Sequence, residues 1–235
     1  MSESENLKPS AKESAENWLW NTQDIPEKGT HFVGTDELDK ALILSTLSHR
    51  TSRPLLLLFS TRATARNTID NLRFLLGPTV GEKIHYLPSL DFDFYRGLLP
   101  NPEILSERNA TLFHALNDPN GRIFVTTGAA LIQKFVPTES FLEATQILEV
   151  NQEINREEFI QALIEAGYQR QPNAFDSGVF SVRGGVLDIF CPLYPEPLRI
   201  EFFGDLIEEI RFFDPQTQRS LASVSKVFFI PLGQS

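Results

Sequence analysis

Cysteine is nearly absent from this chain of 235 residues, which contains Cys191 and no other. A single thiol excludes an internal disulfide framework and suits a reducing compartment. Because Cys191 ends an apolar stretch, we expect a buried and unreactive thiol. Long apolar runs are also missing, since no stretch approaches the ~18 residues of a membrane span. The polar N-terminus has no apolar export signal, and we therefore expect a cytoplasmic protein without membrane contact.

An excess of basic residues is lacking as well. The chain has 21 lysines and arginines against 31 aspartates and glutamates, which gives a net charge of −10. A protein that neutralises several phosphates needs the opposite balance. We therefore expect little or no autonomous DNA binding, although a local basic patch on a DNA-binding repair domain stays open as an alternative.

Catalytic patterns are missing too. The histidines at 31, 49, 85 and 114 are isolated, and none has another metal ligand at i+4. No G-x-S-x-G nucleophile elbow is present. These absences predict no metal, no cofactor and no catalytic residue, and hence a chain that is not an enzyme.

One string is similar to a phosphate-binding loop, whose pattern is G-x-x-x-x-G-K-[ST]. Gly34 and Lys40 fit the pattern, whereas Asp39 replaces the second glycine and Ala41 replaces the hydroxyl residue. Neighbouring carboxylates would repel a polyphosphate by several kcal/mol (about 4 Å apart in a surface-like dielectric). We interpret the string as a degenerate phosphate loop or as an ordinary acidic helix start, and both predict no ATPase. Lys40 is the single residue that favours a diverged ATP-binding helicase lobe.

The order of apolar segments predicts an α/β fold in two parts. Residues 1–17 are polar and are expected to be a disordered tail. Within 18–136, apolar runs at 55–59, 84–87 and 123–126 alternate with helical patterns at 36–48, 64–76, 104–116 and 128–135. This alternation predicts a parallel sheet, with 55–59 as a strand buried on both faces. Residues 137–214 predict a small α+β domain, and 215–235 a return segment toward the first domain.

The second part has the pattern of one helix and several antiparallel strands. Residues 156–166 are amphipathic, with Asn155 as the expected N-cap and Gly167 at the end. Strands are expected at 178–183, 186–190, 197–203 and 206–213. Side chains of a strand alternate between its two faces, so Arg199, Glu201 and Phe203 share the face opposite the apolar row. Arg183 points the same way in its strand. Arginines beside an exposed aromatic ring are typical of a protein-binding surface.

These segments also resemble a known family. The strings VRGGVLDIF, RIEFFGD and IRFFDPQTQRS, at 182–190, 199–205 and 210–220, are similar to the N-terminal, UvrB-homology module of the bacterial transcription-repair coupling factors, Mfd. Weaker matches occur in the same order at 104–112 and 165–168. The resemblance covers about residues 30–230. For the first part, it implies a degenerate P-loop NTPase-like, or RecA-like, lobe that has lost its ATP site.

The resemblance implies that this chain docks UvrA, the damage-recognition ATPase of nucleotide excision repair. The residues at the family's contact positions are Arg183, Arg199 and Phe203, and Arg170 matches a contact arginine of UvrB. We expect the first two arginines to form salt links with UvrA and Phe203 to fill an apolar pocket, while Glu201 holds the arginines or pairs with a UvrA base. The structural alternative is that Arg199 only pairs with Glu201 or Asp188 within the chain.

Full-length family members also bind RNA polymerase and DNA, and act as ATP-dependent translocases, through domains that this sequence does not contain. No motor motif occurs here. The resemblance therefore implies a non-catalytic recruitment module and not a motor. The enzyme alternative, a diverged nucleotide hydrolase, and the DNA-binding alternative remain the competing hypotheses.

Overall fold

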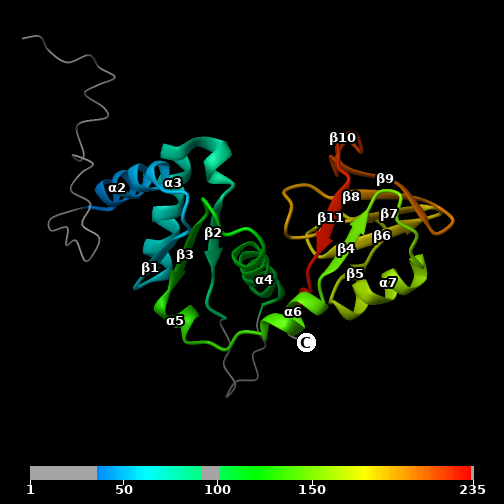
Figure 1. The fold of residues 1–235 in the computed structure, drawn as a ribbon, viewed down its shortest axis with the longest axis horizontal. Helices are drawn as coiled ribbons and strands as arrows, with labels where there is room; N and C mark the ends of the chain where they lie inside the picture. The colour runs from blue at the N-terminus through cyan, green and yellow to red at the C-terminus, as the bar shows by residue number, and fades with distance from the viewer. Residues whose placement is uncertain (1–35, 91–100, 234–235) are drawn as a thin grey trace, which may run out of the picture.

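A computed structural model describes residues 36–90 and 101–233 of the chain. It is a mixed α/β structure with one parallel sheet and two sheets built mainly or wholly from antiparallel pairs. Figure 1 shows two lobes side by side, with the parallel sheet in the N-terminal lobe and the other two sheets in the C-terminal lobe. The predicted disordered tail at 1–17 lies outside the described residues, as does the segment 91–100.

The N-terminal lobe alternates helices and strands as the apolar runs predict. Its elements are α2 (Glu37–Arg50), β1 (Leu55–Phe59), α3 (Arg62–Gly81), β2 (Ile84–Leu87), α4 (Pro102–Asn117), β3 (Ile123–Thr127) and α5 (Gly128–Leu131). The strands are parallel in the order β1-β3-β2. α5 is shorter than the predicted helix at 128–135.

The prediction that residues 55–59 are buried on both faces is wrong. The side chains of Leu56 and Leu58 are exposed, while their neighbours in β1 are half-buried. β1 is an edge strand of the described sheet, and its inner face packs against the core cluster that includes Ile69 and Leu72 of α3. The sequence pattern could not distinguish an edge strand from a central one, because both are continuous apolar runs.

The helices begin and end where local chemistry dictates. Thr61 caps α3 by accepting a hydrogen bond from the backbone N–H of Thr64. α3 continues past the predicted stop, but it bends there, because Gly77 has a φ of 71° and Pro78 follows it. Asn101 caps α4 in the same way, through the N–H of Glu103. Each cap satisfies a backbone donor that has no partner within its helix.

The C-terminal lobe contains α6 (Thr138–Glu143), β4 (Gln146–Glu149), α7 (Arg156–Glu165), β5 (Gln169–Arg170), β6 (Val179–Arg183), β7 (Val186–Ile189), β8 (Leu198–Phe203), β9 (Leu206–Phe213), β10 (Ser220–Ser223) and β11 (Lys226–Phe229). The six-stranded sheet has the order β10-β9-β8-β7-β6-β5, and β11 pairs with β4. α7 and the four predicted antiparallel strands are confirmed. Asn155 caps α7 as expected, and Gly167 follows it with a φ of 96°.

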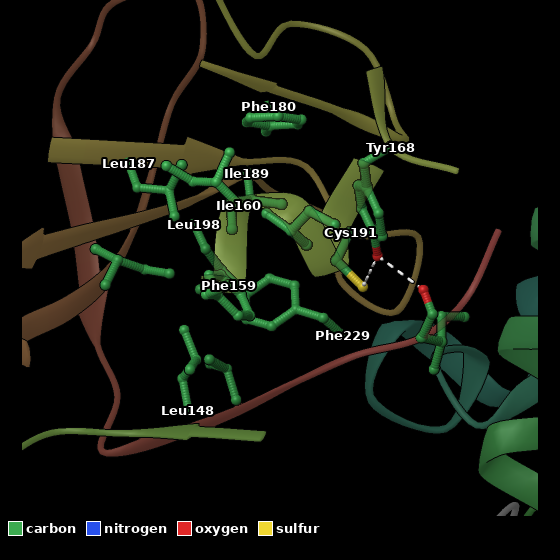
Figure 2. Close-up of a cluster of buried hydrophobic side chains, with 14 of the residues drawn as sticks. Leu148, Phe159, Ile160, Tyr168, Phe180, Leu187, Ile189, Cys191, Leu198 and Phe229 are labelled. Atoms are coloured by element: carbon green, nitrogen blue, oxygen red, sulfur yellow. Dashed lines mark hydrogen bonds between the residues drawn. The ribbon is translucent and has the colours of Figure 1, made fainter. Parts of the chain in front are cut away.

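The main core lies between the inner face of the six-stranded sheet, α7 and the β4–β11 pair. Phe180, Ile189 and Leu198 point inward from the sheet and meet Phe159 of α7 and Leu148 of β4, as Figure 2 shows. Cys191 is fully buried here, which confirms the expectation for its environment. The hydroxyl of Tyr168 donates to the carbonyl oxygen of Ile230 at 3.1 Å and lies 3.3 Å from the sulfur of Cys191.

Helix α4 belongs to both lobes. It packs against β2, while its residue Phe113 joins the core of the C-terminal lobe and contacts the ring of Phe228. The side-chain amide of Asn109 donates to the carbonyl oxygens of Pro231 and Gly233. Residues 215–235 were predicted to return to the first domain. Within that segment, β10 and β11 pair with strands of the C-terminal lobe, and the residues that follow contact α4.

Among the described helices, none combines the length and the hydropathy required to cross a bilayer.

Candidate functional site: the outer face of the six-stranded sheet

The residues of the predicted phosphate loop lie in a capped helix start. Gly34 is outside the described residues. The carboxylate of Asp36 accepts the N–H of Asp39 at 2.8 Å, and the carboxylate of Asp39 accepts the N–H of Asp36 at 3.1 Å. This reciprocal pair is a capping box. Lys40 is exposed in the first turn, and Ala41 is buried in the core of the lobe. Asp39 therefore occupies its position for helix capping.

A pair of histidines gathers in the same lobe. The rings of His85 in β2 and His114 in α4 are stacked, with centroids 4.1 Å apart. The guanidinium of Arg122 donates to Nε2 of His85 at 2.8 Å, so this nitrogen accepts and the ring is neutral. Burial is the largest cause that lowers the pKa of His85 to about 3 and that of His114 to about 4. Over residues 36–90 and 101–233, no three potential ligand side chains are close enough to hold a metal ion.

The second predicted site maps onto one face of the six-stranded sheet, here called the outer face. The strand register aligns Ser181, Asp188, Arg199 and Arg211 across β6, β7, β8 and β9. The neighbouring row contains Arg183, Val186, Glu201 and Glu209. Phe203 follows Glu201 by two residues and continues the same side of β8. The parity prediction for Arg183, Arg199, Glu201 and Phe203 is thus confirmed as geometry.

Asp188 holds the two arginines of this face. Nε and Nη2 of Arg199 donate to its two carboxylate oxygens at 2.7 and 2.9 Å, and Nη2 of Arg183 donates to one of them at 3.3 Å. The side chain of Asp188 is only 2% exposed. The side-chain hydrogen bonding of Arg199 to Asp188 is the largest cause that raises the pKa of Arg199. A bidentate, shielded arginine–carboxylate pair is much stronger than an exposed one.

Arg199 is held from other sides too. Its Nη2 also donates to the side-chain oxygen of Gln218 at 2.8 Å, and its guanidinium lies 4.4 Å from the ring centre of Phe213. The side chain is 16% exposed. We expected Arg199 to form a salt link with a partner. The structure commits its charge to Asp188, which is one of the two internal partners that the structural alternative named.

Glu201 pairs with Arg211 of the adjacent strand and not with either predicted arginine. Arg211 also donates to Glu209, so one guanidinium holds two carboxylates. The side chain of Arg211 is 15% exposed. The outer face is therefore a lattice of paired charges, in which buried Asp188 holds the arginines and nearly buried Arg211 holds the glutamates.

Arg183 and Phe203 are the most accessible of the predicted residues on this face. The side chain of Arg183 is 53% exposed, and Phe203 is 74% exposed at the end of β8. The exposed ring of Phe203 keeps a large apolar area in water, and burial against a partner would remove that area from water. Arg183 has one more contact, with the side-chain oxygen of Asn173 at 3.4 Å.

Arg170 does not join this group. It is exposed in the edge strand β5, and the parallel register places it beside Phe180. Phe180 belongs to the row that faces the core, so Arg170 lies on the opposite side of the sheet from Arg183. The sequence could not have shown this, because the pairing of a two-residue edge strand has no alternation of its own.

Sequence reasoning named Asp188 only as an internal partner for Arg199, and it missed Arg211 and Gln218. Asp188 carried a usable signal, since an aspartate within the apolar string VLDI is costly to bury unless it is paired. Gln218 lies beyond β9, beside Arg199 in space but 19 residues away in sequence.

Comparison with known proteins covers the part of the chain that contains the outer face. Residues 147–234 match the family described as the UvrB interaction domain. The chain is 35% identical over 164 residues to a transcription-repair-coupling factor of Myxococcus xanthus, which covers 68% of this chain. Similar relatives include the factor of Staphylococcus aureus (strain MSSA476), 34% identical over 62% of this chain, and that of Rickettsia typhi, 33% identical over 65%.

The matched segment makes up 14%, 12% and 14% of these three relatives, respectively, so the chain corresponds to a small part of each. The domain match begins at β4 and extends past residue 214 through β10 and β11. It therefore contains the whole outer face. The resemblance to transcription-repair-coupling factors that the sequence motifs indicate is confirmed, and residues 147–234 are similar to the UvrB interaction domain.

Proposed function

We propose that this chain is a non-catalytic docking module that binds UvrA through the outer face and thereby takes part in recruitment for nucleotide excision repair. The observation that carries the proposal is Phe203, which is 74% exposed beside a row of paired charges. An exposed aromatic ring surrounded by fixed charges has the form of an interface anchor with a polar rim. The match of residues 147–234 to the UvrB interaction domain supports this partner.

The residues of the face take different roles in the proposal. Phe203 fills an apolar pocket of UvrA, and Arg183, which is half exposed, forms a salt link with a UvrA carboxylate. Glu201 presents its carboxylate to a UvrA base while Arg211 holds it in place. Arg199 supports the face from within, through Asp188. Arg170 contributes through a separate contact at the sheet edge, because its side of the sheet differs.

The test is a titration of purified UvrA with Phe203→Ala. We expect the affinity to fall about 30-fold, since removal of a central aromatic anchor costs about 2 kcal/mol or more. Phe175→Ala is the matched control, because Phe175 is an exposed phenylalanine of the same lobe, in the loop before β6. It should leave both the affinity and the melting temperature unchanged.

Unchanged affinity in Phe203→Ala, with wild-type binding intact, would remove the outer face as the docking surface. An equal loss in Phe175→Ala would point to a different surface of the same lobe. Arg183→Ala completes the set, and its expected loss is smaller than that of Phe203→Ala, because Arg183 already donates to Asp188 within the chain.

For the N-terminal lobe, we infer a degenerate P-loop NTPase-like lobe that serves as a scaffold. The strand order β1-β3-β2 with alternating helices supports an ancestry of this kind. The capping box of Asp36 and Asp39 supports the absence of nucleotide chemistry, because it uses the carboxylates that would repel phosphates. The division at residue 137, between this scaffold and the docking domain, belongs to the same proposal.

Beyond this chain, the coupling-factor relatives suggest the setting in which the module works. We propose that it acts in the cytoplasm as part of transcription-coupled repair. Contacts with RNA polymerase and DNA would belong to other segments of a coupling factor, since the chain matches 12–14% of the relatives compared.

A further inference from the structure

Asp188 is a buried carboxylate that serves two arginines of different exposure. Its side chain is 2% exposed, whereas that of Arg199 is 16% and that of Arg183 is 53% exposed. Arg199 donates to both oxygens at 2.7 and 2.9 Å, and this bidentate pair already gives the carboxylate a counter-charge. The additional bond from Arg183 is longer, at 3.3 Å, and comes from a side chain that stays half exposed.

The contacts of Arg183 with the described part of the chain involve one guanidinium nitrogen, Nη2, and leave the other two nitrogens available. Nη2 donates both to Asp188 and to the side-chain oxygen of Asn173 at 3.4 Å. Arg199 keeps the carboxylate of Asp188 in place from the other side, and it is itself held by Gln218 and by the ring of Phe213. The buried pair of Asp188 and Arg199 therefore orients the exposed guanidinium of Arg183.

We propose that Asp188 is a positioning residue for docking, which holds Arg183 in the orientation that the partner's carboxylate meets; this rests on the proposed function. A free arginine side chain loses much of its rotamer freedom when it is ordered. An arginine that is ordered before the encounter avoids much of this loss at binding. Asp188 contacts no partner itself, because it is buried below the arginines.

The experiment is a double-mutant cycle on UvrA binding with Asp188→Asn and Arg183→Ala. The asparagine has nearly the same shape and lacks the charge that holds both arginines. We expect Asp188→Asn to weaken binding about tenfold in the wild-type background. In the Arg183→Ala background, the same change should weaken binding only about twofold, because the arginine to be positioned is absent. A merely structural role would give the same fold-change in both backgrounds.

Asn173→Ala provides a second variant that leaves the buried pair intact. It removes the other anchor of Arg183, and we expect a loss of about threefold in affinity that also disappears in the Arg183→Ala background. Each titration is done well below the melting temperature of the least stable variant. Circular dichroism verifies that each variant is folded.

The outcomes separate the two proposals. If Phe203→Ala weakens binding but the effects of Asp188→Asn and Arg183→Ala are additive, the positioning role is overturned and the docking function stands. If Phe203→Ala and Arg183→Ala both leave the affinity at the wild-type value, the proposed function itself fails. Non-additive loss together with the loss in Phe203→Ala supports both.

Discussion

At the scale of single residues, the outer face shows why one arginine is structural and another is available. Arg199 and Arg183 both contact Asp188, but they differ in burial, with side chains 16% and 53% exposed. Removing one partner of a buried pair leaves an unpaired charge in a poorly solvated place, which costs far more than losing a surface pair. Two residues of the same type on the same face therefore differ in how much their loss should affect stability.

This difference predicts that the two substitutions lower stability by unequal amounts. Arg199→Ala should lower the free energy of unfolding by about 3 kcal/mol, because Asp188 would lose its bidentate partner. Arg183→Ala should lower it by less than about 1 kcal/mol, since Asp188 keeps Arg199. Urea denaturation followed by circular dichroism measures both. Equal effects of the two substitutions would contradict this assignment. Because Arg199→Ala is expected to destabilise the fold, it is a poor probe of binding.

At the scale of elements, the contact between β2 and α4 depends on two neutral histidines. The rings of His85 and His114 are stacked, and burial lowers the pKa of each from 6.5, to about 3 and about 4 respectively. Arg122 lowers both further, His114 and Arg73 add to the effect on His85, and Asp118 opposes it on His114. The folded state therefore favours the neutral rings.

The sign of the pH dependence follows from this depression. Between pH 6.5 and about 4, the unfolded chain binds protons at these histidines while the folded chain does not, so acid stabilises the unfolded state. Stability from this pair is fully present above pH 6.5 and falls as the pH decreases through that window. Urea unfolding at pH 7.5, 6 and 5 should show the decline, and it should be smaller in the double variant His85→Gln, His114→Gln.

His49→Gln is the control for this experiment, because His49 is an exposed residue at the end of α2. Its decline with pH should match that of the wild type. The same decline in the double glutamine variant as in the wild type would show that other groups carry the pH dependence.

At the scale of the whole molecule, α4 joins two lobes that the sequence divides near residue 137. Asn109 is buried and donates to Pro231 at 2.9 Å and to Gly233 at 3.4 Å, which ties the end of the docking domain to the N-terminal lobe. Phe113, four residues and one helical turn further along α4, adds an apolar contact with the ring of Phe228. A rigid connection of this kind would let the N-terminal lobe set the orientation of the outer face.

Asn109→Ala should loosen this connection. Two carbonyl oxygens lose their donor, and a buried group without a partner costs about 1–3 kcal/mol. We expect a lower melting temperature and faster hydrogen exchange at the backbone amides of Ile230, Leu232 and Gly233. Asn117→Ala, at the exposed end of α4, is the matched control and should change neither quantity. Unaltered exchange at 230–233 in Asn109→Ala would mean that the apolar contacts alone hold the lobes together.

Local signals in the sequence predicted most elements of this fold. α7 follows from an amphipathic pattern between Asn155 and Gly167, and β8 follows from the alternation around Arg199. Such patterns depend on residues that are close to one another along the chain, so they can be read directly from the sequence. The exposed leucines of β1 could not be predicted, because exposure of a strand depends on which distant elements cover it. The side of the sheet on which Arg170 lies depended in the same way on a distant pairing.

The sequence by itself determined that Arg199, Glu201 and Phe203 share one face of β8, because strand parity is a property of the backbone. It also determined, through motifs at 182–220, which family the chain resembles. Only the tertiary structure decided with which partner each of these charges pairs and how exposed it stays. Asp188, Arg199 and Gln218 come from three separate segments, and a charge is neutralised by whatever the fold brings within a few ångströms, however far away it lies along the chain.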